Sequence, residues 1–439
     1  MKLAGPNGPE NVGRSMVTTA FGNLAGPLAA LITAPILAWS LGVTGRGEVA
    51  AATAPLLLLT VAATLGVPEA VNHFVAARKL SLRMAVGKGA LVLLLTGAVS
   101  TLLTIIFAGQ LSGGDAEVAD LIALASIAIV PSLVVGLLRG AASGLHQWNW
   151  VLRERAVNNA TKVVGICGLA VIGQLGIESA IVVIAISPLI GGLSYISLRR
   201  ADWNAMDSSP DGARANLVGY GSRIWIGSLS GVLLVRLDQV LMTPLSSVEQ
   251  LGLYAVAVNI ADLMLILNSA VRDVTFSSDS AAASSERLQK SARASFLASL
   301  VMGLVVATTL PFWLPFVFGA SFTDAVPVAE LLILATVIGI PGSIAGAGLS
   351  ARGRPEMRSI SLVVACTVNI VAMLILLPSM GAMGAAIATL IGNVISANLN
   401  LFFLWRLFGI NPWAFYRIGP RDVSSLVGMT RSLLSRARR

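Results

Sequence analysis

Long runs of apolar residues alternate with short polar segments along nearly the whole chain. Twelve of these runs, each bounded by charged residues, Pro or Gly, approach the ~20 residues that a helix needs to cross a bilayer. Nothing resembles the weak ten-residue alternation of barrel strands, so helices are the expected spanning element. We therefore predict an all-α polytopic membrane protein with helices over about 16–41, 49–75, 85–109, 118–138, 156–175, 177–198, 218–243, 250–272, 293–318, 327–350, 358–378 and 382–406.

The second half of this pattern repeats the first after a shift of 205 residues. The shift aligns Gly47 with Gly252, Lys88 with Arg293, Gly176 with Gly381, and Ala180 with Ala385; Gly144 aligns with Gly348 after 204 residues. Tandem copies of one membrane unit are the parallel-repeat architecture of many transporters. The repeat predicts two six-helix lobes related by rotation about the membrane normal, with a cavity between the first, second, seventh and eighth helices.

Two polar segments complete the predicted organisation. Residues 199–216 (RRADWNAMDSSPDGARAN) read as a flexible linker between the lobes at 1–198 and 217–406. In the tail, 407–439, apolar residues recur at helical spacing from Arg421 onward and Arg fills the remaining positions. The tail is either a basic amphipathic helix on the anionic inner leaflet or a solvated extension.

The distribution of charge predicts the orientation. If the N-terminus is inside, every Lys and Arg except Arg46 and Arg236 lies in a cytoplasmic segment or at an adjoining helix end. The short outer segments carry acids instead, among them Asp115, Glu117 and Asp324. This satisfies the positive-inside rule at each crossing and predicts that both termini are cytoplasmic.

Composition narrows the class of protein. Hydrophobic residues make up 56% of the chain and charged residues only 12%, and the mean hydropathy is +0.83. A soluble domain carries about a quarter charged residues, so this chain cannot cover a water-facing surface. The net charge of +9 is explained by membrane orientation, and no nucleic-acid partner is expected. The first apolar run is too long for the core of a signal peptide, so we expect it to stay as a helix.

Catalytic and metal-binding patterns are absent from the sequence. Cys167 and Cys366 each lie in an apolar run without a nearby Cys or His, which predicts neither a disulfide nor a metal site. The chain has two His, no paired carboxylates in a polar loop and no GxxxxGK[ST] motif. We therefore expect neither an enzyme nor a cofactor.

Polar residues inside the predicted spans are the candidates for function, because a charge at mid-bilayer costs about 2.5–3.5 kcal/mol on insertion scales. In the first lobe they form two sets, one at i, i+3 and i+4 and the other at i, i+1 and i+4, and the members of each set share a helix face. Each set lies near the cytoplasmic mouth, where it either lines an inward-facing cavity or snorkels to the interface. The sets are Glu69, Asn72 and His73, and Asn158, Asn159 and Lys162.

In the second lobe the charges lie deeper. Arg236 and Asp238 are two residues apart, so they point to opposite sides of the seventh helix and do not pair with each other. Asn259 and Asp262 share a face of the eighth helix, with Asp262 near mid-membrane. Asp262 is therefore protonated, or it is paired with Arg236 or Lys162.

The segments LGVTGRGEVA, LGVPEAVNHFVA and RLDQVLM…SSVEQLGLYAVAVNIAD resemble bacterial polysaccharide-export flippases of the multidrug/oligosaccharidyl-lipid/polysaccharide (MOP) superfamily. The resemblance implies twelve helices in two lobes, as in MATE transporters, in the bacterial cytoplasmic membrane. It implies alternating access and a cargo of undecaprenyl-diphosphate-linked oligosaccharide, with membrane lipids and polysaccharide-assembly proteins as partners. Cavity cations face the diphosphate in this family, and the matching candidates here are Arg14, Lys162, Arg223 and Arg236.

Other functions compete with this interpretation. A cation-coupled drug antiporter of the same superfamily would use membrane acids, for which Asp238, Asn259 and Asp262 are the candidate coupling residues. A lipid II flippase usually has two more C-terminal spans. A polysaccharide polymerase or ligase needs a large outer loop to hold its catalytic groups, and all the predicted outer loops are short. Membrane cations suit an anionic cargo better than a cationic drug.

Overall fold

A computed structural model describes residues 9–200, 216–264, 285–417 and 419, with side chains from residue 26 onward and, in the first range, up to residue 196. Its regular elements are all α-helices and short 3₁₀ helices, and the described ranges contain no strand. The chain divides into two compact units, Met1–Leu229 and Ser230–Arg439. The predicted linker falls almost entirely outside the described residues, and so does the amphipathic part of the tail.

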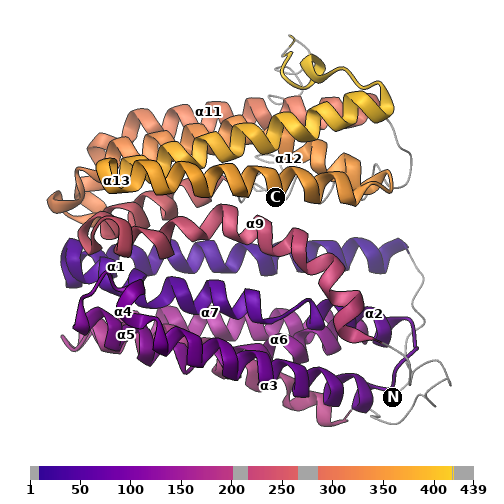
Figure 1. Cartoon of the computed structure of the whole chain (residues 1–439), viewed down its shortest axis with the longest axis horizontal. Coiled ribbons are helices and arrows are strands. Elements are labelled where there is room, and N and C mark those ends of the chain that lie inside the picture. The colour runs from indigo at the N-terminus through magenta and orange to yellow at the C-terminus, as the bar shows by residue number, and fades with distance from the viewer. Residues whose placement is uncertain (1–8, 201–215, 265–284, 418, 420–439) are drawn as a thin grey trace, which may run out of the picture. The chain divides into compact units, whose positions relative to one another are not determined.

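Unit 1 is built from helices that follow one another through short turns (Figure 1). A hydrophobic core that includes Val67, Ile129, Leu133 and Ile181 fills its interior. The elements are α1 (Pro9–Ala63), α2 (Val67–Ala76), α3 (Leu82–Ile106), α4 (Ala108–Leu111), α5 (Ala116–Ser126), α6 (Ile129–Gly144), α7 (Trp148–Val171), α8 (Ile177–Gly192) and η1 (Leu193–Arg200). The next helix, α9 (Leu217–Leu245), begins in unit 1 and ends in unit 2.

Unit 2 continues with helical residues 248–264. A smaller core around Leu288, Ile344, Leu404 and Phe415 lies among its last helices. The remaining elements are α11 (Ser285–Phe318), η3 (Ala320–Phe322), α12 (Ala325–Ala351), α13 (Pro355–Phe408) and η4 (Pro412–Phe415). The last long helix stops at Gly409 in a left-handed conformation, and the Asn411 side chain accepts a hydrogen bond from the backbone of Trp413 to cap η4.

Glycines interrupt the long helices where the pattern predicts separate spans. Gly42 inside α1 has φ 68° and Gly381 inside α13 has φ 54°, a region of φ that Gly enters without a Cβ penalty. The helix predicted over 49–75 is not continuous: α1 ends at Ala63, and Gly66, at φ 70°, precedes α2. A Cβ on Gly66 would lie 2.2 Å from the Gly221 carbonyl oxygen, so this break lets two backbones touch.

The described residues include eight helical stretches long and apolar enough to cross a membrane. Two of them, Gly26–Ala63 and Pro355–Phe408, are 38 and 54 residues long and contain the glycine breaks. Large apolar side chains on several helices are exposed, such as Val171 at 86% and Phe316 at 83%, as a lipid-facing surface requires. The protein is a multi-pass, all-helical membrane protein, while the total of twelve crossings stays a prediction.

The 205-residue shift found in the sequence also relates local structure in the two units. Gly176 precedes α8, and Gly381, its counterpart, breaks α13 directly before Ala382. In unit 1 a Cβ on Gly45 would lie 3.5 Å from the Ile177 side chain. In unit 2 the counterpart Gln250 contacts Gly381 and accepts a hydrogen bond of 2.9 Å from the Ala382 backbone. The same positions therefore meet in both copies.

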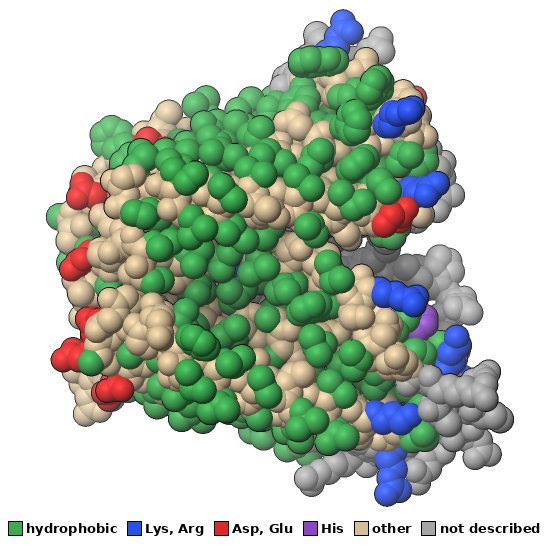
Figure 2. All heavy atoms as spheres, viewed as in Figure 1, with side chains coloured by type: hydrophobic (Ala, Val, Ile, Leu, Met, Phe, Trp, Pro, Cys, Tyr) green, Lys and Arg blue, Asp and Glu red, His purple; other side chains and the backbone are tan. Residues whose placement is uncertain are grey.

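Charged side chains gather at the ends of the helices, with a hydrophobic band between (Figure 2). In unit 1 the exposed Glu117 lies in the first turn of α5, and in unit 2 the exposed Asp324 directly precedes α12; we call this end of each unit its acidic end. Lys and Arg gather at the opposite end of each unit, which we call its basic end (Figure 2); in unit 2 the exposed Lys290 lies near the start of α11 and the exposed Arg354 directly precedes α13. The positive-inside rule predicts such a separation, and by that rule we expect the basic end of each unit to face the cytoplasm.

Cysteine labelling tests this orientation. In a variant with Cys167 and Cys366 replaced by Ala, Glu117→Cys and Asp324→Cys should react with an impermeant maleimide in intact cells, because both positions are exposed at the acidic end. Lys290→Cys and Arg354→Cys, exposed at the basic end, should react only after permeabilisation. Labelling of the second pair in intact cells would contradict the orientation.

Candidate functional site

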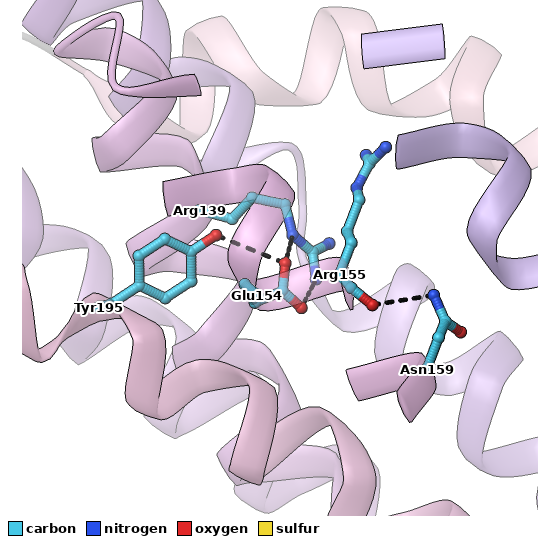
Figure 3. Close-up of polar contacts among 5 residues, drawn as sticks. All are labelled: Arg139, Glu154, Arg155, Asn159 and Tyr195. Carbon is cyan, nitrogen blue, oxygen red and sulfur yellow. Dashed lines mark hydrogen bonds and ion pairs between the residues drawn. The ribbon is translucent and has the colours of Figure 1, made fainter. Parts of the chain in front are cut away.

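Ionisable groups within the helices of unit 1 gather around Glu154 of α7 (Figure 3). Its carboxylate is fully buried and accepts two hydrogen bonds from Arg139 of α6, of 3.0 Å from Nε and 2.9 Å from Nη2. The Tyr195 hydroxyl of η1 lies 3.4 Å from Glu154 Oε2. A bidentate pair of this kind fixes distance and angle together. The cluster therefore joins α6, α7 and η1, and we call it the Glu154 brace.

The brace was not predicted from the sequence. Arg139 was counted only as a cytoplasmic helix-end charge, and nothing distinguished Glu154 from a solvated acid. The usable signal was the short turn between α6 and α7, residues 145–147, which makes these two helices neighbours. An acid and an Arg on adjoining ends of such helices are candidates for a pair.

Polar residues continue from the brace along one face of α7. Arg155, Asn158, Asn159 and Lys162 occur at i, i+3, i+4 and i+7, and all four are half-buried. The Asn159 amide donates to the Arg155 carbonyl at 2.9 Å (Figure 3). The opposite face carries exposed apolar side chains, including Val164 at 70% and Val171 at 86%. The polar face of α7, which we call the α7 stripe, thus points into the protein and away from lipid.

The first predicted polar set lies on α2. Glu69 and His73 are exposed and Asn72 is half-buried. The His73 ring stacks on Tyr220 of α9 with centroids 4.4 Å apart and an angle of 15° between the planes. The structure thus gives His73 a packing contact, whereas a role for this set in a cavity stays a prediction.

Two of the predicted anion-binding cations have less structural definition. Arg14 lies in the first part of α1, before residue 26, where side chains are not described. Arg223 is exposed on α9, two residues before Trp225, whose indole donates to the Ala62 carbonyl at 3.1 Å. No contact among the described side chains joins Arg14 or Arg223 to the α7 stripe.

In unit 2 the structure selects one of the alternatives for Asp262. Its Oδ2 lies 2.9 Å from Arg236 Nη2, in a single hydrogen-bonded ion pair between α9 and the helical residues 248–264. The two side chains are 23% and 37% exposed, so the pair is only partly enclosed by the protein. Asp262 is therefore paired with Arg236, as one sequence interpretation held, and Asn259 lies half-buried one turn earlier.

Asp238 has a separate set of partners. It is 2% exposed and accepts hydrogen bonds from the Tyr254 hydroxyl and from the Gln239 backbone. Tyr254 in turn lies 3.4 Å from the Thr389 hydroxyl of α13. Neither Tyr254 nor Thr389 was predicted from the sequence as a partner of Asp238, because both lie in apolar runs that give no polar periodicity.

A further buried polar group lies one turn away along these helices. Asn369 of α13 is fully buried, and neither of its amide atoms has a hydrogen-bond partner among the described groups. A Cβ on Gly392 would lie 2.8 Å from Leu234 and 3.1 Å from Asn369, so the three residues are in contact. Leu234 is four residues before Asp238, and Gly392 is three after Thr389. Asn369 thus adds amide polarity beside the Asp238 cluster.

The 205-residue shift shows that the two units carry different polar sets. The positions equivalent to the α7 stripe in unit 2 are Ile360, Val363, Val364 and Thr367. Conversely, the positions equivalent to Arg236, Asp238 and Asp262 in unit 1 are Leu31, Thr33 and Leu57. If the two units share one fold, as the repeat predicts, that fold does not require these charges, and function or local pairing is left as their explanation.

A family model for polysaccharide biosynthesis proteins matches residues 12–276. This match covers more than half of the chain. The chain belongs to this family. A search of curated protein sequences found no match.

Solved structures show the fold of this polysaccharide biosynthesis protein. The lipid II flippase MurJ in an inward closed conformation matches with a TM-score of 0.71 and 15% identity, over 89% of this chain and 87% of MurJ. An inward-facing multidrug resistance MATE transporter of the MOP superfamily matches with a TM-score of 0.65 and 15% identity, over 89% and 98%. A MOP superfamily transporter from Pyrococcus furiosus, described as having a binding pocket of reverse polarity, matches with a TM-score of 0.57 and 14% identity, over 93% of this chain and 96% of that chain. The expected MATE-like fold is confirmed.

The energetics of the brace can be tested by a double-mutant cycle. Arg139→Gln leaves a buried carboxylate without its ion partner and should destabilise the protein by about 3–5 kcal/mol. Arg139→Gln combined with Glu154→Gln removes both charges and should restore much of the loss. Thermal unfolding in detergent measures the stability of each variant. Equal melting temperatures for the single and double variants would show that Arg139 and Glu154 are not energetically coupled.

Proposed function

We propose that this protein is a flippase that moves an undecaprenyl-diphosphate-linked oligosaccharide across the cytoplasmic membrane by alternating access. Membership of the polysaccharide biosynthesis family and the MOP fold support a transport role in glycan assembly. The observation that carries the choice of cargo is the position of Lys162 and Arg236, cations that lie inside membrane helices and face the protein.

A diphosphate needs such cations because its charge cannot cross hydrocarbon unpaired. Lys162 lies on the inward face of α7 and offers a point charge toward the cytoplasmic side. Arg236 presents a planar donor group that matches phosphate geometry. In this proposal the two cations hold the head group in succession while the polyprenyl tail stays in lipid.

The Arg236–Asp262 pair gives the second step a release mechanism. A single hydrogen bond in a partly exposed pair is weak enough for an anionic ligand to replace it. The phosphate would take the Arg236 donors, and Asp262 would take up a proton or a cation. Return of Asp262 to Arg236 would then displace the cargo on the outer side.

Asp238 is the proposed site of the coupling ion. Its carboxylate, the Thr389 hydroxyl and the Asn369 amide supply oxygen ligands within one region of unit 2. Hard cations such as Na⁺ prefer oxygen ligands, and a proton would need only the carboxylate. Asp238 would equally suit a drug antiporter, whose cationic cargo has no use for Lys162 and Arg236.

Export of surface polysaccharide in a strain that depends on this protein tests the proposal. Lys162→Ala and Arg236→Ala should each abolish export, and Arg236→Lys should restore part of it, because a point charge still holds phosphate. Arg153→Ala is the matched control, since Arg153 is exposed on the outward side of α7. Normal export by both alanine variants, at wild-type abundance in the membrane, would make these cations structural and remove the support for this cargo.

A further inference from the structure

The last turns of α13, at the basic end of unit 2, expose aromatic rings next to an arginine. Phe402 is 47% exposed, and the centroid of its ring lies 6.0 Å from that of Trp405, which is 51% exposed. Arg406, the next residue, is exposed as well. Because residues at i, i+3 and i+4 share a helix face, this face of α13 ends in a Trp and an Arg. These residue types collect where the hydrocarbon of a bilayer gives way to headgroups.

The same arrangement recurs in η4, after α13 has ended. Trp413 is 79% exposed, and Arg417 is also exposed. The Arg417 backbone N–H donates to the Trp413 carbonyl at 3.0 Å, so the two residues lie one turn apart. Each Trp of this region therefore has an exposed Arg within one turn. Neither Arg406 nor Arg417 forms an ion pair with a described acid.

The exposure of Trp413 is a property of the fold, because η4 is fixed to the rest of unit 2. Phe415 is fully buried in the core of the last helices. Arg293 of α11 donates from Nη1 to a carbonyl of η4 at 3.2 Å. The ring of Tyr416 meets that of Phe296 of α11 with centroids 5.7 Å apart and an angle of 82° between the planes. These contacts bury one side of η4 and leave Trp413 on the other.

A membrane surface accounts for these exposed residues better than water does. An indole has an apolar body and one N–H, which suits the boundary between acyl chains and headgroups. Lys and Arg gather at this end of unit 2 (Figure 2), and we expect this end to face the anionic inner leaflet. A second copy of the chain is a poorer occupant, because a symmetric interface would bring the same arginines together.

We propose that Trp405, Arg406, Trp413 and Arg417 form a binding surface for anionic phospholipids of the inner leaflet, which we call the η4 foot. The two Trp side chains lie at the boundary between headgroups and acyl chains. The two Arg side chains donate to the phosphates of the headgroups. The η4 foot thereby sets the depth at which α13 leaves the membrane, and it does not depend on the proposed cargo.

Binding of phosphatidylglycerol to the full protein in detergent, titrated by native mass spectrometry, tests the contribution of the cations. Arg406→Gln and Arg417→Gln should each raise the Kd about five-fold, the loss expected for one cation at an anionic membrane surface. Phosphatidylcholine, which has no net charge, should bind more weakly and respond less to either change. Arg354→Gln is the matched control, because Arg354 is exposed at the same end and pairs with Glu356; it should leave the Kd unchanged.

The location of Trp413 is tested by fluorescence quenching in phosphatidylglycerol nanodiscs. In the variant with Cys167 and Cys366 replaced by Ala, Trp413→Cys should carry an environment-sensitive fluorophore. A lipid with a nitroxide near its headgroup should quench this fluorophore, and aqueous iodide should have little effect. The same fluorophore on Arg354→Cys should be quenched mainly by iodide.

Three results would overturn the η4 foot. The first is an unchanged Kd for phosphatidylglycerol in both arginine variants. The second is an equal loss in Arg354→Gln, which would make general surface charge responsible. The third is strong quenching by iodide at position 413, which would place η4 in water. Equal melting temperatures across the variants would show that unfolding is not the cause. None of these results bears on the proposed cargo, which export and translocation measure separately.

Discussion

A charge inside a membrane helix has to be paired or kept in contact with water, because hydrocarbon solvates it poorly. The described helices meet this constraint in three ways. Glu154 is fully buried and accepts two hydrogen bonds from one edge of the Arg139 guanidinium, whereas Asp262 makes a single, partly exposed contact with Arg236. Arg155 and Lys162 lie on an inward face that remains partly accessible. The tight pair joins α6 to α7, and in the proposed function Lys162 and Arg236 are the cations that the cargo contacts.

Comparing the two units distinguishes features that set the helix boundaries from charges that occur in only one unit. Shared features, such as the glycines at positions 176 and 381, occur in both units and set the helix boundaries. The charges do not repeat: the α7 stripe belongs to unit 1, and the Arg236–Asp262 pair with the Asp238 cluster belongs to unit 2. In the proposed cycle unit 1 captures the anionic cargo. Unit 2 then releases it and binds the coupling ion.

Long apolar runs were enough to predict the helical membrane class, and the boundary predicted between the spans 358–378 and 382–406 coincides with the break at Gly381. Local spacing also placed Asn158, Asn159 and Lys162 on one face of α7. Local spacing could not predict which residues pair between different helices. The Arg139–Glu154 contact and the Tyr254 hydrogen bond to Asp238 join residues on different helices, whose partners no periodicity identifies. The break at Gly66 was missed because its cause is a backbone contact with Gly221, more than 150 residues away.

The most direct test of the central claim is translocation by the purified protein in liposomes. A fluorescent undecaprenyl-diphosphate-linked oligosaccharide, placed in both leaflets, is followed by the fraction that a membrane-impermeant quencher reaches. The account predicts that the accessible fraction rises from about one half toward completion with wild-type protein and stays at about one half with the Lys162→Ala, Arg236→Ala double variant. Equal fractions for wild type, double variant and protein-free liposomes, with correctly inserted protein, would contradict it.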